Sequence, residues 1–241
     1  MKQGQPIINA PGVVVCLLAI FVGIHLVRSF IPESQDGWLI ELLAFVPARL
    51  SPGGAEFYGG EAAVYTQFVT HMFLHGDLTH LIVNSAWFLA FGTSVARRTG
   101  GLRFLAFFLI CGICGALFYL AWNPGMRNPM IGASGAISGL MGASFRFLFG
   151  ALHSADPDAI AGESYQPPLL SLRETLTDRR LLSFILGWTG LNILFAWGAA
   201  EFADGMNIAW EAHLGGFYAG LLLFGWFDRQ PGVHQNVASA E

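Results

Sequence analysis

Six runs of mostly apolar residues constrain the fold of this chain more than any other feature. Each has roughly the 20 residues that a helix needs to cross the hydrocarbon core of a bilayer. Only 12% of the residues are charged, whereas a soluble domain has about 25%, so there are too few charges for an ordinary water-facing surface. The sequence therefore predicts an all-α polytopic membrane protein, a single membrane domain of six transmembrane helices over residues 1–241. The predicted spans are 11–30, 78–96, 104–122, 130–150, 181–200 and 206–227.

The Lys and Arg residues predict how these spans are oriented, because cytoplasmic loops are enriched in them. With six spans both termini share one side, which holds nine of the twelve Lys and Arg residues; Arg28, Arg49 and Arg127 lie on the other. We therefore expect both termini in the cytoplasm, an outer loop at 31–77 and a cytoplasmic linker at 151–180. The membrane itself is expected to be a bacterial inner membrane. The apolar stretch Leu39–Val46 is expected to lie in the membrane interface. Residues 11–30 are expected to be a retained anchor, since no clear cleavage site follows them.

Composition also argues against several functions. The net charge is −4, so the chain lacks the basic excess typical of nucleic-acid binding. Cys16, Cys111 and Cys114 all lie in apolar runs and are interpreted as packing residues. The single Cys-x-x-Cys pair has no second pair to complete a metal site. We expect no nucleic-acid partner, no cofactor and no bound metal.

The fourth run opens with Gly132-Ala133-Ser134-Gly135. Serine and glycine in membrane helices are often packing residues, and Gly135, Gly139 and Gly142 share one helix face. Ser134, however, lies near a helix start, where backbone N–H groups lack intrahelical partners and can hold an anion. Both interpretations stay open on this motif alone.

The sixth run contains Ala212-His213-Leu214-Gly215-Gly216. A histidine there can be an ordinary buried residue, but His213, Gly216 and Gly220 share a face by helical spacing. Two glycine-lined helices can approach closely, which would bring a serine hydroxyl within reach of an imidazole base.

A third cluster of polar residues surrounds the start of the second run. His80 and Asn84 are four residues apart and share a helix face, where both can donate hydrogen bonds to an oxyanion. His71 and His75 have the same spacing, which leaves a metal site as an alternative. The glutamate of a His-Glu-x-x-His zinc motif is missing.

Together these clusters resemble the rhomboid family of intramembrane serine proteases, over about residues 65–225. The resemblance rests on His71, His75, His80 and Asn84, on Gly132 to Gly135, and on Ala212, His213 and Gly216, which follow the order found in that family. It implies a six-helix core that cuts the transmembrane helices of other membrane proteins.

The resemblance also implies a role for each of these residues. Ser134 would be the nucleophile and His213 its base. His80, Asn84 and the Ser134 backbone N–H would form the oxyanion site. His71 and His75 would shape the outer loop and water access, and Gly132, Gly135 and Gly216 would support the site.

Two positions depart from the family pattern. Thr66-Gln67 stands where many relatives have Trp-Arg, and Ser138 stands where an aromatic ring often stacks on the base. We expect a Ser-His dyad with no carboxylate behind the histidine. Glu211 lies two residues from His213, on another side of the helix, and Glu201 and Asp204 are expected in an outer loop, from which folding back into the bilayer would be costly.

Two other functions remain as alternatives. A catalytically inactive rhomboid-like protein would bind membrane helices without cutting them. A transporter would show paired intramembrane charges or repeated broken helices, whereas Glu211 is the single candidate charge and no repeat is visible.

Overall fold

The computed structural model describes residues 9–57, 59–153, 167–197 and 208–228. Within these ranges the regular secondary structure is helical apart from one isolated bridge, between Phe45 and Met130. The α-helices are α1 (Gly12–Phe30), α2 (Glu33–Leu43), α3 (Gly60–Thr70), α4 (Leu78–Trp87), α5 (Thr93–Thr99), α6 (Gly101–Trp122), α7 (Ser134–His153), α9 (Leu172–Thr177), α10 (Arg179–Trp197) and α12 (Trp210–Leu223). Short 3-10 turns are η1 (Pro47–Leu50), η2 (Gly54–Glu56), η3 (His71–Phe73) and η5 (Phe224–Trp226), and η4 (Phe88–Gly92) is a π-helical turn joining α4 to α5.

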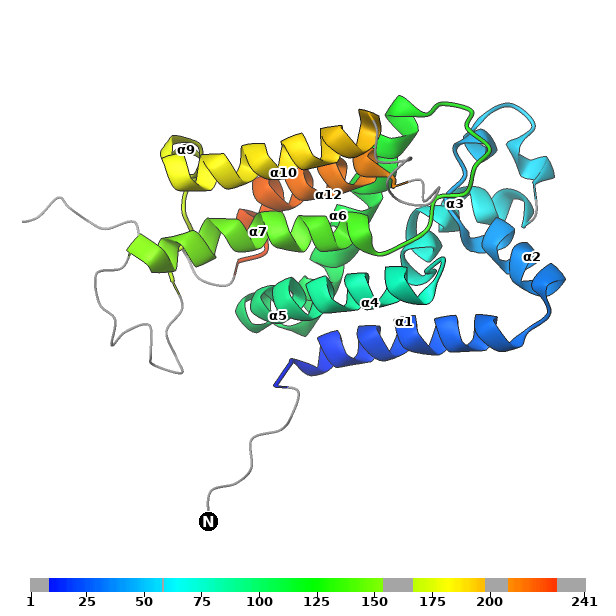
Figure 1. Cartoon of the computed structure of the whole chain (residues 1–241), viewed down its shortest axis with the longest axis horizontal. Helices are drawn as coiled ribbons and strands as arrows, with labels where there is room; N and C mark the ends of the chain where they lie inside the picture. The colour runs from blue at the N-terminus through cyan, green and yellow to red at the C-terminus, as the bar shows by residue number, and fades with distance from the viewer. Residues whose placement is uncertain (1–8, 58, 154–166, 198–207, 229–241) are drawn as a thin grey trace, which may run out of the picture.

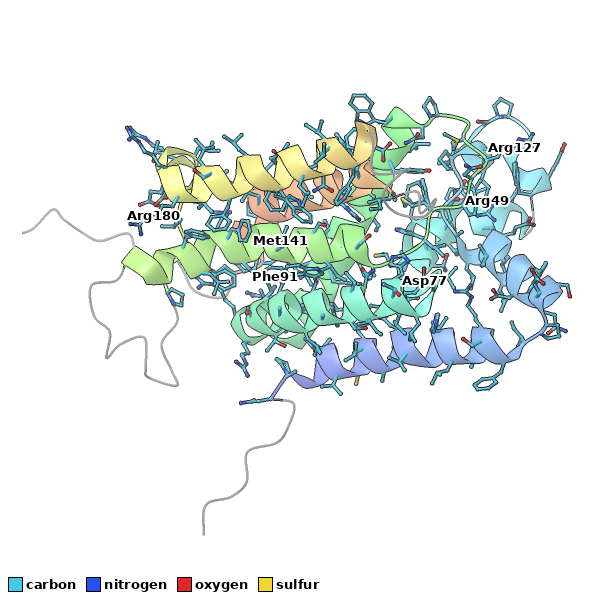
Figure 2. All side chains as sticks on the ribbon, in the orientation of Figure 1. Arg49, Asp77, Phe91, Arg127, Met141 and Arg180 are labelled. Atoms are coloured by element: carbon cyan, nitrogen blue, oxygen red, sulfur yellow. The ribbon has the colours of Figure 1, made fainter. Side chains whose placement is uncertain are left out.

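The long helices form a bundle. In Figure 1, α1, α4 and α7 are successive neighbours, α12 packs on α7 and α6, and α10 packs on α12, while α2 and α3 gather at one end. Figure 2 shows Arg49, Asp77 and Arg127 at that end and Arg180 at the other, with Phe91 and Met141 between them. An apolar middle with charged ends suits a protein that spans a bilayer.

Three of the described helices are long and apolar enough to cross a membrane: Gly12–Phe30, Leu78–Thr99 and Gly101–Trp122. The other three predicted spans correspond to α7, α10 and α12, and residues 198–207 around two of them lie outside the described ranges. The number of six spans therefore stays a prediction. The fourth span differs in its start, because Met130 is extended and pairs with Phe45, and α7 begins only at Ser134.

The centre of the bundle is formed by α6, α7 and α12, which approach through glycines. A Cβ added to Gly216 would lie 1.9 Å from the Gly135 carbonyl oxygen, and one added to Gly220 would lie 1.9 Å from that of Gly139. On α7, a Cβ at Gly142 would lie 2.4 Å from the Phe217 carbonyl oxygen. The α7 and α12 backbones therefore touch directly, which no larger residue would allow.

The predicted outer loop, 31–77, is mostly helical, with α2, α3 and three 3-10 turns. The last residues of the stretch expected at the membrane interface, Leu39–Val46, do not lie there. Ala44, Phe45 and Val46 are buried inside the protein. The backbone bonds of Phe45 to Met130 attach this segment to the approach to α7.

Gln67, at one of the two positions that depart from the family pattern, organises this region. Its side chain is fully buried, and its Oε1 accepts hydrogen bonds from the Val46 N–H (2.9 Å) and from Nη1 of Arg49 (3.4 Å). Arg49 also donates to the Ala44 carbonyl at 2.6 Å. A glutamine on α3 and an arginine on η1 thus hold the buried strand-like segment in place.

Candidate active site

Ser134 is the first residue of α7, and the backbone just before it determines its position in the site. Gly132 has a φ of 124°, a conformation that side-chain-bearing residues rarely adopt, and its N–H donates to the His71 carbonyl at 2.9 Å. The chain therefore turns sharply into the helix just before the serine. Backbone N–H groups of the first helical turn have no intrahelical acceptor, so they are available to a ligand.

His213 projects from α12 toward this turn. Its Nε2 lies 2.8 Å from the Ser134 Oγ, within hydrogen-bond distance. The close glycine contacts between α7 and α12 explain the short distance. A Cβ added to Gly135 would lie 3.2 Å from the carbonyl oxygen of Ala212, the residue before His213. The structure thus brings together two residues that are 79 positions apart in sequence.

Two residues of α10 complete the surroundings of His213, and sequence analysis missed both. Asn192 Oδ1 lies 3.0 Å from His213 Nδ1. The Trp188 ring lies alongside the imidazole, with centroids 6.4 Å apart and planes tilted by 31°. Trp188 is thus an aromatic neighbour of the base in a chain that has Ser138 at the usual stacking position. Asn192 was detectable as a polar residue inside an apolar run, a type of position that is commonly functional.

His80 and Asn84 lie on one face of α4, near the start of α7. A Cβ built on Gly132 would lie 2.8 Å from His80 Nε2 and 3.8 Å from Ser134 Oγ, so the histidine ring borders the serine. The Gly76 N–H donates to His80 Nδ1 at 3.3 Å; because Nδ1 accepts, a neutral ring carries its proton on Nε2. One N–H of Asn84 donates to the His80 carbonyl at 2.9 Å, and an amide has a second N–H to offer.

His71 and His75 are buried beside this cluster rather than at the serine. His71 Nδ1 pairs with the Gln67 carbonyl at 2.8 Å, and burial lowers the pKa of His71 to about 4. The ring of His75 packs between Phe21 and His80, and burial, followed by repulsion from nearby cationic groups, lowers its pKa to about 3. Both rings are therefore neutral at pH 7. Among the described residues, no three His, Cys, Asp or Glu side chains form a group that could hold a metal.

Of the three carboxylates that are candidates for a third catalytic member, Glu211 lies within the described residues. Glu211 accepts a hydrogen bond from Asn123 at the end of α6, at 2.9 Å, rather than contacting His213. Glu201 and Asp204 lie outside the described residues. The group that occupies the far side of the imidazole is an amide, that of Asn192.

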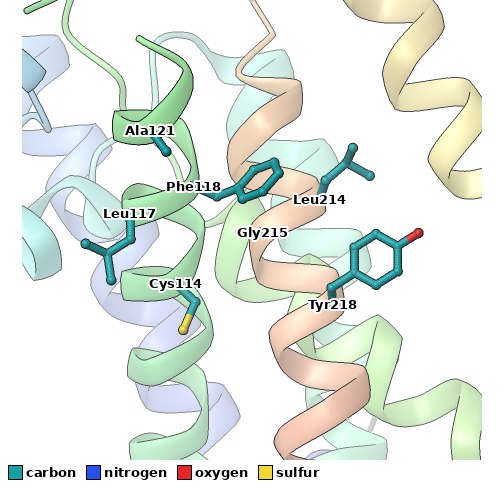
Figure 3. A pocket seen from close by; sticks show the side chains of 7 residues that line it. All are labelled: Cys114, Leu117, Phe118, Ala121, Leu214, Gly215 and Tyr218. Carbon is teal, nitrogen blue, oxygen red and sulfur yellow. The ribbon is translucent and has the colours of Figure 1, made fainter. Parts of the chain in front are cut away.

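An open apolar groove of about 350 Å³ lies elsewhere, between α6 and α12. Figure 3 shows Cys114 and Phe118 on α6 and Leu214 and Tyr218 on α12 among the residues that line it. Neither Ser134 nor His213 lines the groove, and the Tyr218 hydroxyl is bonded to Thr189 of α10 at 2.7 Å. The groove is therefore separate from the serine–histidine site.

Fold and site define a helical membrane protein with a serine–histidine pair between two of its helices. The family model described as the Rhomboid domain matches residues 62–230, more than half of the chain. The chain belongs to the rhomboid family and is a multi-pass integral membrane protein. This confirms the family and the helical membrane fold predicted from the sequence.

The chain is similar to several rhomboid proteins. It is 38% identical over 77 residues to "Rhomboid protease GluP" of Bacillus subtilis, a match covering 32% of this chain and 15% of that protein. It is 29% identical over 157 residues to "Putative rhomboid protease YdcA" of the same organism, covering 65% and 64% of the two chains. "RHOMBOID-like protein 6, mitochondrial" of Arabidopsis thaliana is 32% identical over 77 residues, 32% of this chain and 24% of that protein. The chain thus spans less than two thirds of each of these relatives.

Proposed function

We propose that this protein is a serine endopeptidase that hydrolyses peptide bonds in or near the transmembrane helices of other membrane proteins. The observation that supports it most directly is the 2.8 Å contact between Ser134 Oγ and His213 Nε2. Serine is a weak nucleophile at neutral pH, and a base at that distance activates it. The family and the names of the relatives agree with this chemistry.

In the proposed reaction, the Ser134 hydroxyl gives its proton to His213 Nε2 as Oγ attacks the peptide carbonyl. The carbonyl oxygen becomes an oxyanion, which the Ser134 N–H, His80 Nε2–H and the second N–H of Asn84 stabilise. His213 then passes the proton to the leaving amine, and an acyl ester stays on Ser134. Water hydrolyses the ester with His213 again as base.

Covalent labelling tests the nucleophile. A fluorophosphonate probe should label the purified wild-type protein and leave Ser134→Ala unlabelled, because the probe captures a serine activated by a base. A metal chelator should not change labelling. Labelling that persists in Ser134→Ala, or a wild-type protein that does not react, would contradict the proposal and favour an inactive helix-binding protein.

The proposed location is a bacterial inner membrane, with both termini in the cytoplasm and the site near the outer face. The distribution of Lys and Arg supports this orientation. In a cysteine-free background, a single cysteine near Gly60 should react with an impermeant reagent added outside intact cells. One at Ala161 should react only after the membrane is opened, and the opposite pattern would reverse the orientation.

A further inference from the structure

The side chain of Asn192 makes two hydrogen bonds, and together they fix which way its amide faces. Its Nδ2 donates to the Trp188 carbonyl, one turn earlier on α10, at 2.8 Å. Its Oδ1 lies 3.0 Å from His213 Nδ1. Because the carbonyl can only accept, the amide nitrogen must face it, which leaves the amide oxygen facing the imidazole.

This arrangement selects one form of His213. An amide oxygen accepts but does not donate, so the nitrogen that faces it, Nδ1, must carry a proton. In the neutral ring Nε2 is then unprotonated and has a lone pair directed at Ser134 Oγ, 2.8 Å away. That is the form a general base needs, whereas the other tautomer would present an N–H to the serine.

We propose that Asn192 is a positioning residue that holds His213 in the tautomer and orientation required for proton transfer from Ser134. The inference rests on the proposed function, because it assigns a role in that same reaction. When His213 becomes an imidazolium, Nδ1–H still donates to the amide, so the bond also stabilises the charged form. A neutral amide performs this task without placing a carboxylate at membrane depth, where a charge is costly.

The contact between Asn192 and His213 depends on the position of α10. The buried side chains among the described residues of α10 are Leu181, Ile185 and Asn192. The first two pack with Phe217 and Leu221 toward the opposite end of α12. Near the site, α10 therefore meets α12 through a polar contact to the base itself. Any displacement of this part of α10 would remove the acceptor from His213.

Labelling kinetics test the role without requiring knowledge of the substrate. Asn192→Leu removes the acceptor while keeping a side chain branched at the same atom, and it should slow fluorophosphonate labelling of Ser134 about tenfold to a hundredfold, the range for losing one hydrogen bond to a group that becomes charged. Asn192→Asp keeps an oxygen acceptor and should label within about tenfold of wild type. Its negative charge should also move the acidic limb of the pH–rate profile to higher pH, because the charge favours protonated imidazole. Every variant retains His80, which borders Ser134.

Thr189→Val is the matched control. It removes the bond between Thr189 and Tyr218, another link between α10 and α12, and leaves the His213 contact in place, so labelling should stay within about twofold of wild type. The unfolding midpoint of each variant, measured in detergent, shows whether that variant is folded.

The outcomes separate this inference from the proposed function. A wild-type protein that does not label would overturn both. A labelled wild type with a folded Asn192→Leu that reacts at the same rate would overturn only the role of Asn192. If Asn192→Leu does not fold, the Asn192→Asp profile decides: a shifted acidic limb supports the role, and an unshifted limb overturns it.

Discussion

Helix α12 meets two of its neighbours, α7 and α10, in very different ways. On one side it meets α7 backbone to backbone, with Gly216 and Gly220 against the carbonyls of Gly135 and Gly139. On the other side it meets α10 through side chains, while the α10 glycines Gly187 and Gly190 face open space, with no neighbour within 4 Å of an added Cβ. Near the site that second interface consists of side-chain contacts, from Thr189 to Tyr218 and from Asn192 to His213.

The difference separates two requirements of the proposed chemistry. The atoms that would react, Ser134 Oγ and His213 Nε2, lie across the interface where backbones touch and little movement is possible. The residue that would orient the base comes from α10, which is less enclosed by the protein: its Leu191 and Leu194 are 42% and 64% exposed and suited to lipid contact. The distance between Ser134 and His213 is thus set by backbone packing. The proposed tautomer of His213 is set by its hydrogen bond with Asn192.

The largest expected effect is at the glycine interface. Gly220→Ala would place a Cβ 1.9 Å from the Gly139 carbonyl oxygen, so α7 and α12 must separate, at a cost of at least about 3 kcal/mol, the upper end for overpacking. Denaturant unfolding in detergent should show this loss together with loss of labelling at Ser134. Gly190→Ala is the matched control and should leave stability unchanged or raise it by up to about 1 kcal/mol through helix propensity. Equal effects of the two would show that the contact between the α7 and α12 backbones is not what makes Gly220 sensitive to an added side chain.

An intermediate effect is expected where α10 is packed. Ile185 is buried against α7 and α12, so Ile185→Ala leaves a cavity and should destabilise the protein by about 2 kcal/mol, at the low end for such truncations because lipid also solvates the side chain. Leu194→Ala, at an exposed position on the same helix, should change the unfolding midpoint little. A large loss in Leu194→Ala would mean that the outer half of α10 is packed more tightly than the structure shows.

The smallest effect is expected at the hydrogen bond of Thr189 with Tyr218. A double-mutant cycle with Thr189→Val and Tyr218→Phe should give a coupling of about 0.6 kcal/mol, the average for such bonds between membrane helices. Unfolding free energies of the four proteins measure it. A coupling as large as the Gly220→Ala effect would show that polar contacts, rather than glycine packing, hold α12.

Part of the site was predictable because helical spacing is local. His80 and Asn84, four residues apart, were expected on one face of a helix, and α4 has them there. Glycine faces together with the family resemblance predict the pairing of Ser134 with His213, and in the structure Ser134 Oγ lies 2.8 Å from His213 Nε2. Gln67 illustrates the limit. From the sequence it was only a departure from a family pattern, and its buried bonds to Val46 and Arg49 join segments about 20 residues away.

The sequence by itself determined that this chain is a helical membrane protein, because hydrocarbon admits only long apolar segments whose backbone bonds are satisfied internally. It also determined which faces of α7 and α12 can meet, since only glycine permits that approach. The tertiary structure decided which residues contact the imidazole of His213 on the side away from Ser134. Asn192 and Trp188 lie on a helix with no sequence motif shared with the site, and their contact with the imidazole depends on how α10 rests against α12. That placement follows from the packing of Leu181 and Ile185 at the other end of α10, a long-range arrangement that no local pattern encodes.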